Sequence, residues 1–270
     1  MQRGPGTLAV LLVSALAAAC AGEGPPADDA GVRLVEGSRS TPAFPEAALS
    51  FEAPERGAAV SGDTLAARLR LEGFPLAEPT PGFGDRGLAL SDRGQHVHFI
   101  LDDRPYRALY DLSGPVEVAA EELEPGIHLL RAFASRQWHE SVKSDGAFAF
   151  TWFRVGDTAA AEFDPEAPML TYSRPKGTYV GADADSVMVD FYLTNAELGT
   201  GEGSHAVRLT VDDTLDWELT EWAPHYVLGL DEGTHTFRLE LLAPDGSVVP
   251  GDHNATEREI VVERPGADGS

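Results

Sequence analysis

The chain has 270 residues, of which 43% are hydrophobic and 24% are charged, a composition typical of a globular protein with a sizeable core. Its 44 Asp and Glu residues outnumber its 20 Lys and Arg residues, so the formal net charge is −24. This balance argues against nucleic acid as a partner, because nucleic-acid binding depends on Lys and Arg that neutralise phosphates. It also repels anionic lipid headgroups, so attachment to a membrane would need an anchor rather than a basic patch.

Residues 1–19 have the pattern of an export signal. Arg3 is followed by an apolar run of about a dozen residues, which is too short to span a bilayer. The run ends in Ala-Ala-Ala before Cys20, the only cysteine of the chain. These residues resemble the lipobox of bacterial lipoproteins, although Ala17 stands where that motif usually has Leu. The resemblance implies that cleavage before Cys20 leaves a lipidated N-terminus; the alternative is an ordinary Ala-x-Ala cleavage site and a free thiol.

Lipidation of Cys20 predicts an exported protein that is anchored in the membrane of a bacterial cell envelope. Ala21 after that cysteine favours the outer membrane or the periplasm if the cell is Gram-negative, and the face of the membrane is not predicted. A single cysteine also excludes an intrachain disulfide, so each domain must be held by its hydrophobic core. Residues 20–46 are small, acidic and rich in Pro, which predicts a flexible tether.

The rest of the chain contains one pattern twice. In the first copy, Gln-His-Val-His-Phe-Ile-Leu-Asp-Asp at 95–103 is followed by Gly-Ile-His-Leu-Leu-Arg at 126–131. In the second copy, His-Ala-Val-Arg-Leu-Thr-Val-Asp-Asp at 205–213 is followed by Gly-Thr-His-Thr-Phe-Arg at 233–238. A strand that ends in Asp-Asp and a Gly-x-His strand thus form a repeating unit, which predicts two copies of one fold.

Alternating apolar and polar residues, separated by turn signals, predict about seven short strands in each copy. The fold class is therefore all-β, with two tandem immunoglobulin-like β-sandwiches. The Gly-x-His phrases and the alternation after them resemble bacterial extracellular immunoglobulin-like or fibronectin-III-like modules, and the resemblance implies this fold without a function. The predicted boundaries are a first domain at 47–157, a linker at 158–165, a second domain at 166–264 and a disordered tail at 265–270.

His96 and His98 are the sharpest candidates for chemistry. Residues i and i+2 of a strand point the same way, so both imidazoles lie on the face opposite the apolar Val97. Copper and zinc both accept imidazole ligands, and His139, in the hairpin at 136–143, is a possible third ligand. The alternative is a pair of histidines that lie at the surface or pack against the opposing loop. There is no Cys or Met pattern that would complete a blue-copper site.

His128 and His235 each follow a glycine by two positions at the start of a strand. Because both copies share this histidine, we expect a structural role in which the imidazole bonds to the backbone of the corner. The chain has neither a Gly-x-Ser-x-Gly elbow nor a Gly-rich phosphate loop, so no catalytic residue is predicted.

The preferred interpretation is a non-enzymatic binding or scaffolding lipoprotein that presents loops of the first domain to a protein or glycan partner. It has no cofactor and no metal ligand, and its binding residues are His96, His98, Arg136, Trp138 and His139. The first alternative is a periplasmic protein that handles copper or zinc through His96, His98 and His139. The second is an accessory module of polysaccharide processing. The identity of the partner and the oligomeric state are not predicted.

Overall fold

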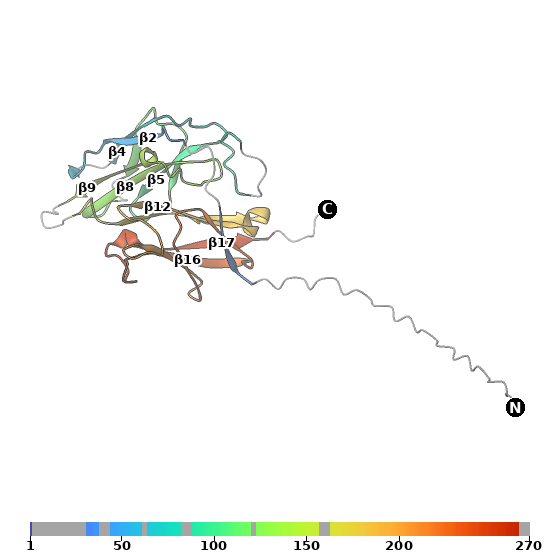
Figure 1. Ribbon diagram of the computed structural model, residues 1–270. Coiled ribbons are helices and arrows are strands. Elements are labelled where there is room, and N and C mark those ends of the chain that lie inside the picture. The colour runs from blue at the N-terminus through green and yellow to red at the C-terminus, as the bar shows by residue number, and fades with distance from the viewer. Residues whose placement is uncertain are drawn as a thin grey trace. The chain divides into compact units, whose positions relative to one another are not determined.

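A computed structural model describes residues 1, 31–37, 44–60, 64–82, 88–119, 123–156 and 163–264. From Gly31 onward the described residues form one compact unit, built of strands and three short 3-10 turns (Figure 1). These turns are η2 (Asp145–Ala147), η3 (Gly181–Asp185) and η4 (Asp252–Asn254). No helix in this part of the chain is long and apolar enough to cross a membrane. The predicted signal from residue 2 onward, Cys20 and the predicted tail lie outside the described residues.

The first copy of the repeat forms a sandwich of two sheets. One sheet has the order β2 (Ala48–Ala53), β4 (Thr64–Glu72), β7 (Val116–Ala119). The other has the order β3 (Ala58–Val60), β9 (Phe148–Val155), β8 (Gly126–Ser135), β5 (His96–Leu101), β6 (Arg107–Leu109). The buried side chains of β4 alternate with exposed ones, as a strand covered on one face requires. Val97, Phe99 and Leu101 of β5 point into the core between the sheets, as predicted.

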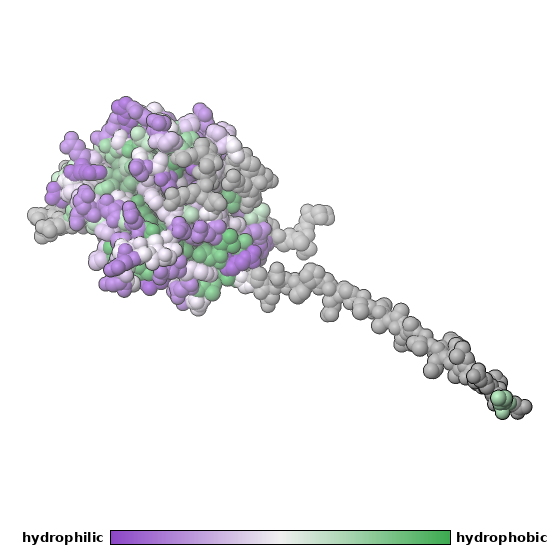
Figure 2. Space-filling view, viewed as in Figure 1, coloured by the Kyte–Doolittle hydropathy of each residue, from purple (hydrophilic) through white to green (hydrophobic). Residues whose placement is uncertain are grey.

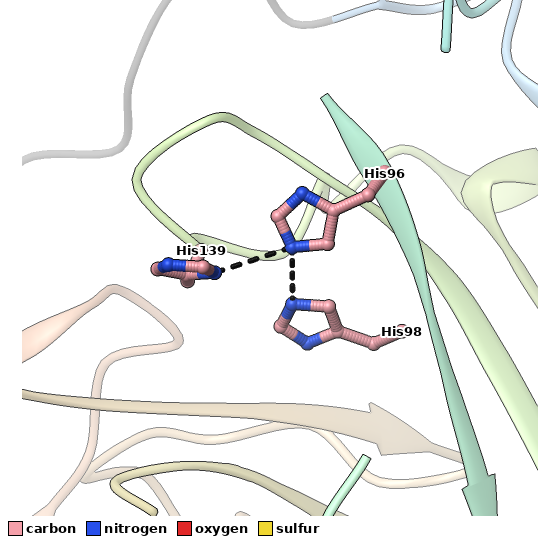
Figure 3. A group of neighbouring side chains, drawn as sticks. All are labelled: His96, His98 and His139. Atoms are coloured by element: carbon pink, nitrogen blue, oxygen red, sulfur yellow. Dashed lines mark hydrogen bonds between the residues drawn. The ribbon is translucent and has the colours of Figure 1, made fainter. Parts of the chain in front are cut away.

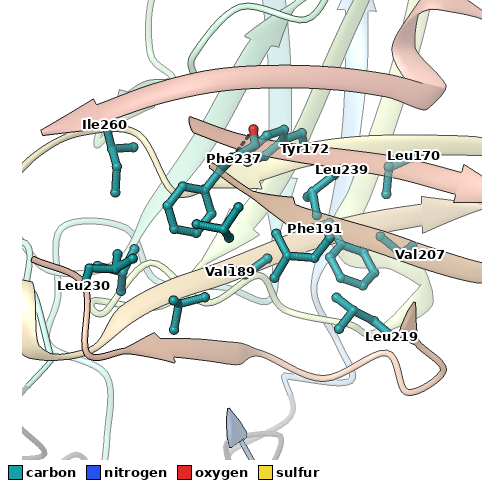
Figure 4. Close-up of a cluster of buried hydrophobic side chains, with 14 of the residues drawn as sticks. Leu170, Tyr172, Val189, Phe191, Val207, Leu219, Leu230, Phe237, Leu239 and Ile260 are labelled. Atoms are coloured by element: carbon teal, nitrogen blue, oxygen red, sulfur yellow. Dashed lines mark hydrogen bonds between the residues drawn. The ribbon is translucent and has the colours of Figure 1, made fainter. Parts of the chain in front are cut away.

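The second copy forms a second sandwich with the same strand order. Its smaller sheet runs β1 (Arg33–Glu36), β15 (His225–Leu228), β12 (Val187–Thr194), β10 (Met169–Arg174). Its larger sheet runs β11 (Gly177–Val180), β17 (Ala255–Glu263), β16 (Gly233–Leu242), β13 (Ala206–Val211), β14 (Leu215–Leu219). Figure 4 shows side chains of both sheets meeting in its core, with Phe191 of β12 and Phe237 of β16 among them. The prediction of an all-β fold with two sandwiches is confirmed.

Among the strands of the described residues, β1 is the one without a counterpart in the first sandwich, and it corrects part of the predicted tether. Residues 33–36 pair antiparallel with β15, with Leu34 opposite Val227. Leu34 packs against the core of the second sandwich, and the pairing covers the unpaired backbone groups of an edge strand. A strand of four residues in an acidic, Pro-rich stretch is too short to show a recognisable alternation of apolar and polar residues. Its partner strand also lies far along the chain.

The two sandwiches stack face to face, and we call the contact between them the junction. Strands β5 and β10 are buried at every position, which means that both of their faces are covered. In Figure 1, β12 of the second sandwich lies next to the sheet of the first that contains β5 and β8. Ile100, on the outer face of β5, packs in one cluster with Tyr192 of β12. The residues of β5 that were predicted to face away from the first core therefore lie in the junction and not at the surface.

Polar and charged side chains cross the junction. The Arg131 guanidinium donates to the carbonyl of Leu170 at 2.9 Å, and the ammonium of Lys143 lies 2.8 Å from a carboxylate oxygen of Asp190. Lys143 and Lys176 are the only lysines of the chain, and both lie here. Hydrophilic side chains otherwise cover much of the face that Figure 2 shows, in keeping with the high charge of the chain.

The Gly-x-His corners have the structural role that the repeat predicted. One ring nitrogen of His128 bonds to the carbonyl of Glu124 at 2.7 Å, and the other to the carboxylate of Asp102 at 2.8 Å. His235 makes the same contacts in the second copy, at 3.0 Å and 2.7 Å to Asp231 and Asp212. The repeated Asp-Asp and Gly-x-His phrases are therefore two halves of one bonded corner.

Candidate metal centre

The strand geometry of β5 brings two imidazoles together. His96 and His98 are two residues apart on the outer face of the strand, and both have 0% of their surface exposed. Their ring centroids are 4.9 Å apart. The covering sandwich buries them, so neither is a surface histidine.

His139 reaches the same place from a tight turn between β8 and η2. The amide of Arg136 donates to the carbonyl of Glu140, and the amide of His139 donates to the carbonyl of Arg136, both at 2.9 Å. His139 itself has a left-handed backbone with φ of 69°, a conformation that few residues other than glycine adopt. The turn directs its ring toward β5, as Figure 3 shows.

The three imidazoles converge through one nitrogen each. Nε2 of His96 lies 3.0 Å from Nε2 of His98 and 3.2 Å from Nδ1 of His139, and all three nitrogens are within 4.8 Å of one another. With metal–nitrogen bonds of about 2.0–2.1 Å, nitrogens that share one ion lie roughly 3.3–3.5 Å apart. The two separations that involve His96 are close to this range, and the rings of His98 and His139 must move toward each other for one ion to bind all three nitrogens.

A hydrogen bond fixes the proton of His96. A carbonyl only accepts, so Nδ1 of His96 donates to the oxygen of Gly94 at 2.9 Å, and Nε2 of the neutral ring carries a lone pair. That lone pair accepts from whichever neighbouring nitrogen carries a proton, Nδ1 of His139 at 3.2 Å or Nε2 of His98 at 3.0 Å. The hydroxyl of Tyr106 accepts from Arg174 at 3.0 Å and lies 3.3 Å from Nδ1 of His139. A metal ion bound here would take the place of the shared proton.

His98 completes the set from the same strand. Its Nδ1 lies 3.0 Å from the hydroxyl of Ser173, which belongs to β10 of the second sandwich. When Nδ1 donates to this hydroxyl, Nε2 presents a lone pair to the cluster. The Tyr106 ring stacks on the other face of the imidazole, with centroids 3.5 Å apart and 7° between the planes. Ser173 and Tyr106 therefore hold the orientation of this ring.

Electrostatics keep the three imidazoles neutral, as metal ligation requires. Burial, together with the charges of Arg174 and Lys176, lowers the pKa of His96 to about 4. Burial also holds the pKa of His98 well below its usual value, and the other imidazoles and the same two cations add to this effect. The pKa of His139 is lowered by burial first and then by Arg174.

The other two predicted binding residues belong to a neighbouring buried group. The indole of Trp138 donates to the carboxylate of Glu140 at 2.7 Å, and the guanidinium of Arg136 lies 3.7 Å from that carboxylate. Arg136 and Trp138 are only 3% and 2% exposed. Together with the burial of His96 and His98, this corrects the expectation that these side chains form a surface for a protein or glycan partner.

Four residues around the centre were missed by the sequence analysis: Tyr106, Ser173, Arg174 and Lys176. Three of them belong to the first strand of the second copy and the turn after it, nearly 80 positions from the His-x-His pair. They reach the site only because the sandwiches stack, and no pattern in the sequence reports that contact. Tyr106 lies in an aromatic-rich connection, but nothing in its spacing indicates a partner.

The fold and the site together define an all-β protein of two stacked sandwiches with a buried three-histidine centre. No family model matches the chain, and no curated protein matches its sequence. Among solved structures, it is similar to the fibronectin(III)-like modules of Clostridium thermocellum CbhA, with 14% identity, a TM-score of 0.28 and coverage of 80% of this chain and 94% of that chain.

Two further similarities belong to proteins of different kinds. One is a Bacteroides ovatus protein of a mixed-linkage glucan utilization locus, solved with a heptasaccharide, with 14% identity, a TM-score of 0.22 and coverage of 80% and 70%. The other is the β-glucuronidase of Parabacteroides merdae, with 8% identity, a TM-score of 0.23 and coverage of 80% and 24%. At these TM-scores nothing about the function of this chain follows from the similarities.

Proposed function

We propose that this protein is a non-enzymatic, envelope-anchored lipoprotein that binds a transition-metal ion, copper or zinc, through His96, His98 and His139. The observation that carries the proposal is the convergence of three ring nitrogens within 4.8 Å of one another, with the lone pair of His96 directed at the other two rings. Imidazole is a ligand that suits both metals.

The surroundings of the cluster support the same function. Metal-bound histidines usually hold their other ring nitrogen in a hydrogen bond, which fixes the tautomer and the ring orientation. His96 bonds to the carbonyl of Gly94 in this way, and His98 bonds to the hydroxyl of Ser173. These contacts prepare both rings for an ion before it arrives.

Titration of the purified protein with copper and with zinc tests the proposal. Wild type is expected to bind one equivalent, and His96→Ala is expected to weaken binding by more than about 100-fold, because a ligand contributes more than the groups that orient it. His205→Ala, a change to a histidine outside the cluster, serves as the matched control and should bind like wild type. Binding that persists unchanged in His96→Ala would sink the proposal.

The envelope location rests on the sequence around Cys20 and has its own test. Labelled palmitate should enter the wild-type protein and not Cys20→Ser, and only the wild type should sediment with membranes. A soluble Cys20→Ser protein that still binds the metal is the expected combination, because the two features lie in different parts of the chain. The protein or glycan partner stays a prediction, and no binding site is proposed for it.

A further inference from the structure

Two cations, Arg174 and Lys176, lie beside the three-histidine centre, and both bind Tyr106. The buried guanidinium of Arg174 donates to the hydroxyls of Tyr106 and Tyr179, both at 3.0 Å. The ammonium of Lys176 donates to the carbonyl of Tyr106 at 2.8 Å and lies 3.7 Å from the centroid of its ring. Among the residues that the structure describes, neither cation forms an ion pair with a carboxylate, although the chain has 44 acidic residues.

The field of these cations reaches the centre. Both cations reach the centre through Tyr106: its hydroxyl, which accepts from Arg174, lies 3.3 Å from Nδ1 of His139, and its ring, which contacts Lys176, stacks on the imidazole of His98 at a centroid distance of 3.5 Å. Their charges therefore oppose a further positive charge between the three rings. The same field opposes a bound metal ion in proportion to its charge, so a dication meets twice the repulsion of a monocation. The cost of removing an ion from water also rises with the square of its charge, and His96 and His98 are fully buried.

The ligand set does not compensate for this repulsion. Three neutral imidazoles bring no negative charge, whereas zinc(II) is almost always four-coordinate and often has thiolate or carboxylate ligands. Copper(I) is a monocation that two or three neutral donors satisfy. It therefore meets less repulsion from Arg174 and Lys176 than zinc(II) does, and it loses less hydration free energy when it is buried. A buried, carboxylate-free set of three imidazoles beside two cations therefore favours the ion of lower charge.

We propose that the centre is selective for copper(I) over zinc(II), and that Arg174 and Lys176 set this preference. The inference rests on the proposed metal-binding function and names the ion that the site takes. Arg174 and Lys176 are specificity determinants that act through their charge without touching the ion. A carboxylate near the centre would have the opposite effect.

The test compares the affinities for the two ions in wild type and in variants of Lys176, which is less buried than Arg174 and easier to replace. Copper(I) affinity is measured without oxygen against a coloured copper(I) chelator, and zinc(II) affinity against a coloured zinc chelator. With roughly a tenfold preference from each cation, wild type should bind copper(I) at least about 100-fold more tightly than zinc(II). Lys176→Gln retains a donor for the Tyr106 carbonyl but loses the charge. It should lower the ratio of copper(I) affinity to zinc(II) affinity about tenfold.

Two control variants separate the charge from other effects. Lys176→Arg retains the charge and should retain the ratio, while Arg68→Gln removes a charge from an exposed position of β4 and should leave the ratio unchanged. If wild type binds neither ion, the metal-binding function itself fails. If wild type binds zinc(II) as tightly as copper(I), the metal-binding function survives and the selectivity is overturned. If the ratio of copper(I) affinity to zinc(II) affinity is the same in Lys176→Gln as in wild type, the proposal that Lys176 sets the selectivity is also overturned.

Discussion

At the scale of single residues, the chain places histidines in two opposite environments. His235 faces a carbonyl and a carboxylate, both of which only accept, so both of its ring nitrogens donate. His96, His98 and His139 face one another in a buried cluster, where burial lowers the pKa of each ring and keeps it neutral. The same residue type therefore stabilises a corner as a cation in one place and offers lone pairs as a neutral ring in the other.

His235 predicts a pH-dependent contribution to stability. Burial alone would lower the pKa of His235, but the hydrogen bond with Asp212 and the contact with Asp231 raise it above the ordinary value. A pKa raised in the folded state contributes stability that is fully present below the unfolded value of about 6.5 and is lost as pH rises through the folded value. His235→Gln should thus lower the free energy of unfolding more at pH 5 than at pH 9. The difference should be on the order of half a kcal/mol, because the site is partly solvated.

Urea unfolding at the two pH values measures this difference, with His205→Gln as the control, since that ring forms no ion pair with a carboxylate of the described residues. If His235→Gln lowers the free energy of unfolding equally at both pH values, protonation of His235 does not stabilise the fold and the prediction is wrong.

Ser173 predicts an effect on metal binding from the other sandwich. Its hydroxyl is 3.0 Å from Nδ1 of His98 and fixes the orientation of that ring. Ser173→Ala should weaken metal binding by about 10–100-fold, the usual cost of losing a group that orients a ligand. Thr151→Val removes a buried hydroxyl that bonds to Pro54 in the first sandwich, so it serves as a control with unchanged affinity. Equal affinities for Ser173→Ala and wild type would show that the junction does not orient the centre.

At the scale of elements, the junction buries an ion pair between Asp190 of β12 and Lys143, which follows β8. Asp190 of β12 is 0% exposed and accepts from the amide and hydroxyl of Ser141 as well as from Lys143. Burial raises the pKa of Asp190, and the ammonium of Lys143 opposes that rise. Removing one partner of such a pair leaves a buried charge without compensation.

Lys143→Met should therefore lower the free energy of unfolding by about 3–5 kcal/mol. Lys143→Met combined with Asp190→Asn should recover most of that loss, because no carboxylate is left uncompensated. Arg70→Met, which breaks an exposed pair with Glu72, should cost less than about 1 kcal/mol. Denaturant unfolding of the four proteins measures these values, and a double variant no more stable than Lys143→Met would refute the coupling of the pair.

At the scale of the whole molecule, the sequence predicted each sandwich and not their stacking. Alternation along 65–71 and the repeated Asp-Asp and Gly-x-His phrases report contacts within a copy, because the alternation has the period of a strand and the phrases occur in both copies. His-Val-His predicted the face of β5 that carries the imidazoles, and His139 was recognised as a possible third ligand. Contacts across the junction occur once, between a residue of the first copy and a residue of the second, so they leave no repeated pattern in the sequence. Ser173 and Arg174 could therefore not be assigned to the site.

The stacking predicts how the metal should affect unfolding of the whole protein. His98 belongs to the first sandwich and Ser173 to the second, and β5 and β10 have both faces covered by the stack. We therefore expect one cooperative thermal transition for both sandwiches. A ligand that binds only the folded state stabilises it by about 2.7 kcal/mol at 100 times its Kd, which should raise Tm by roughly 5–10 °C for a chain of this size. His96→Ala should unfold without any metal-dependent shift. Two separate transitions in wild type, with only the earlier one moved by metal, would mean that the sandwiches unfold independently and that the centre belongs to the first alone.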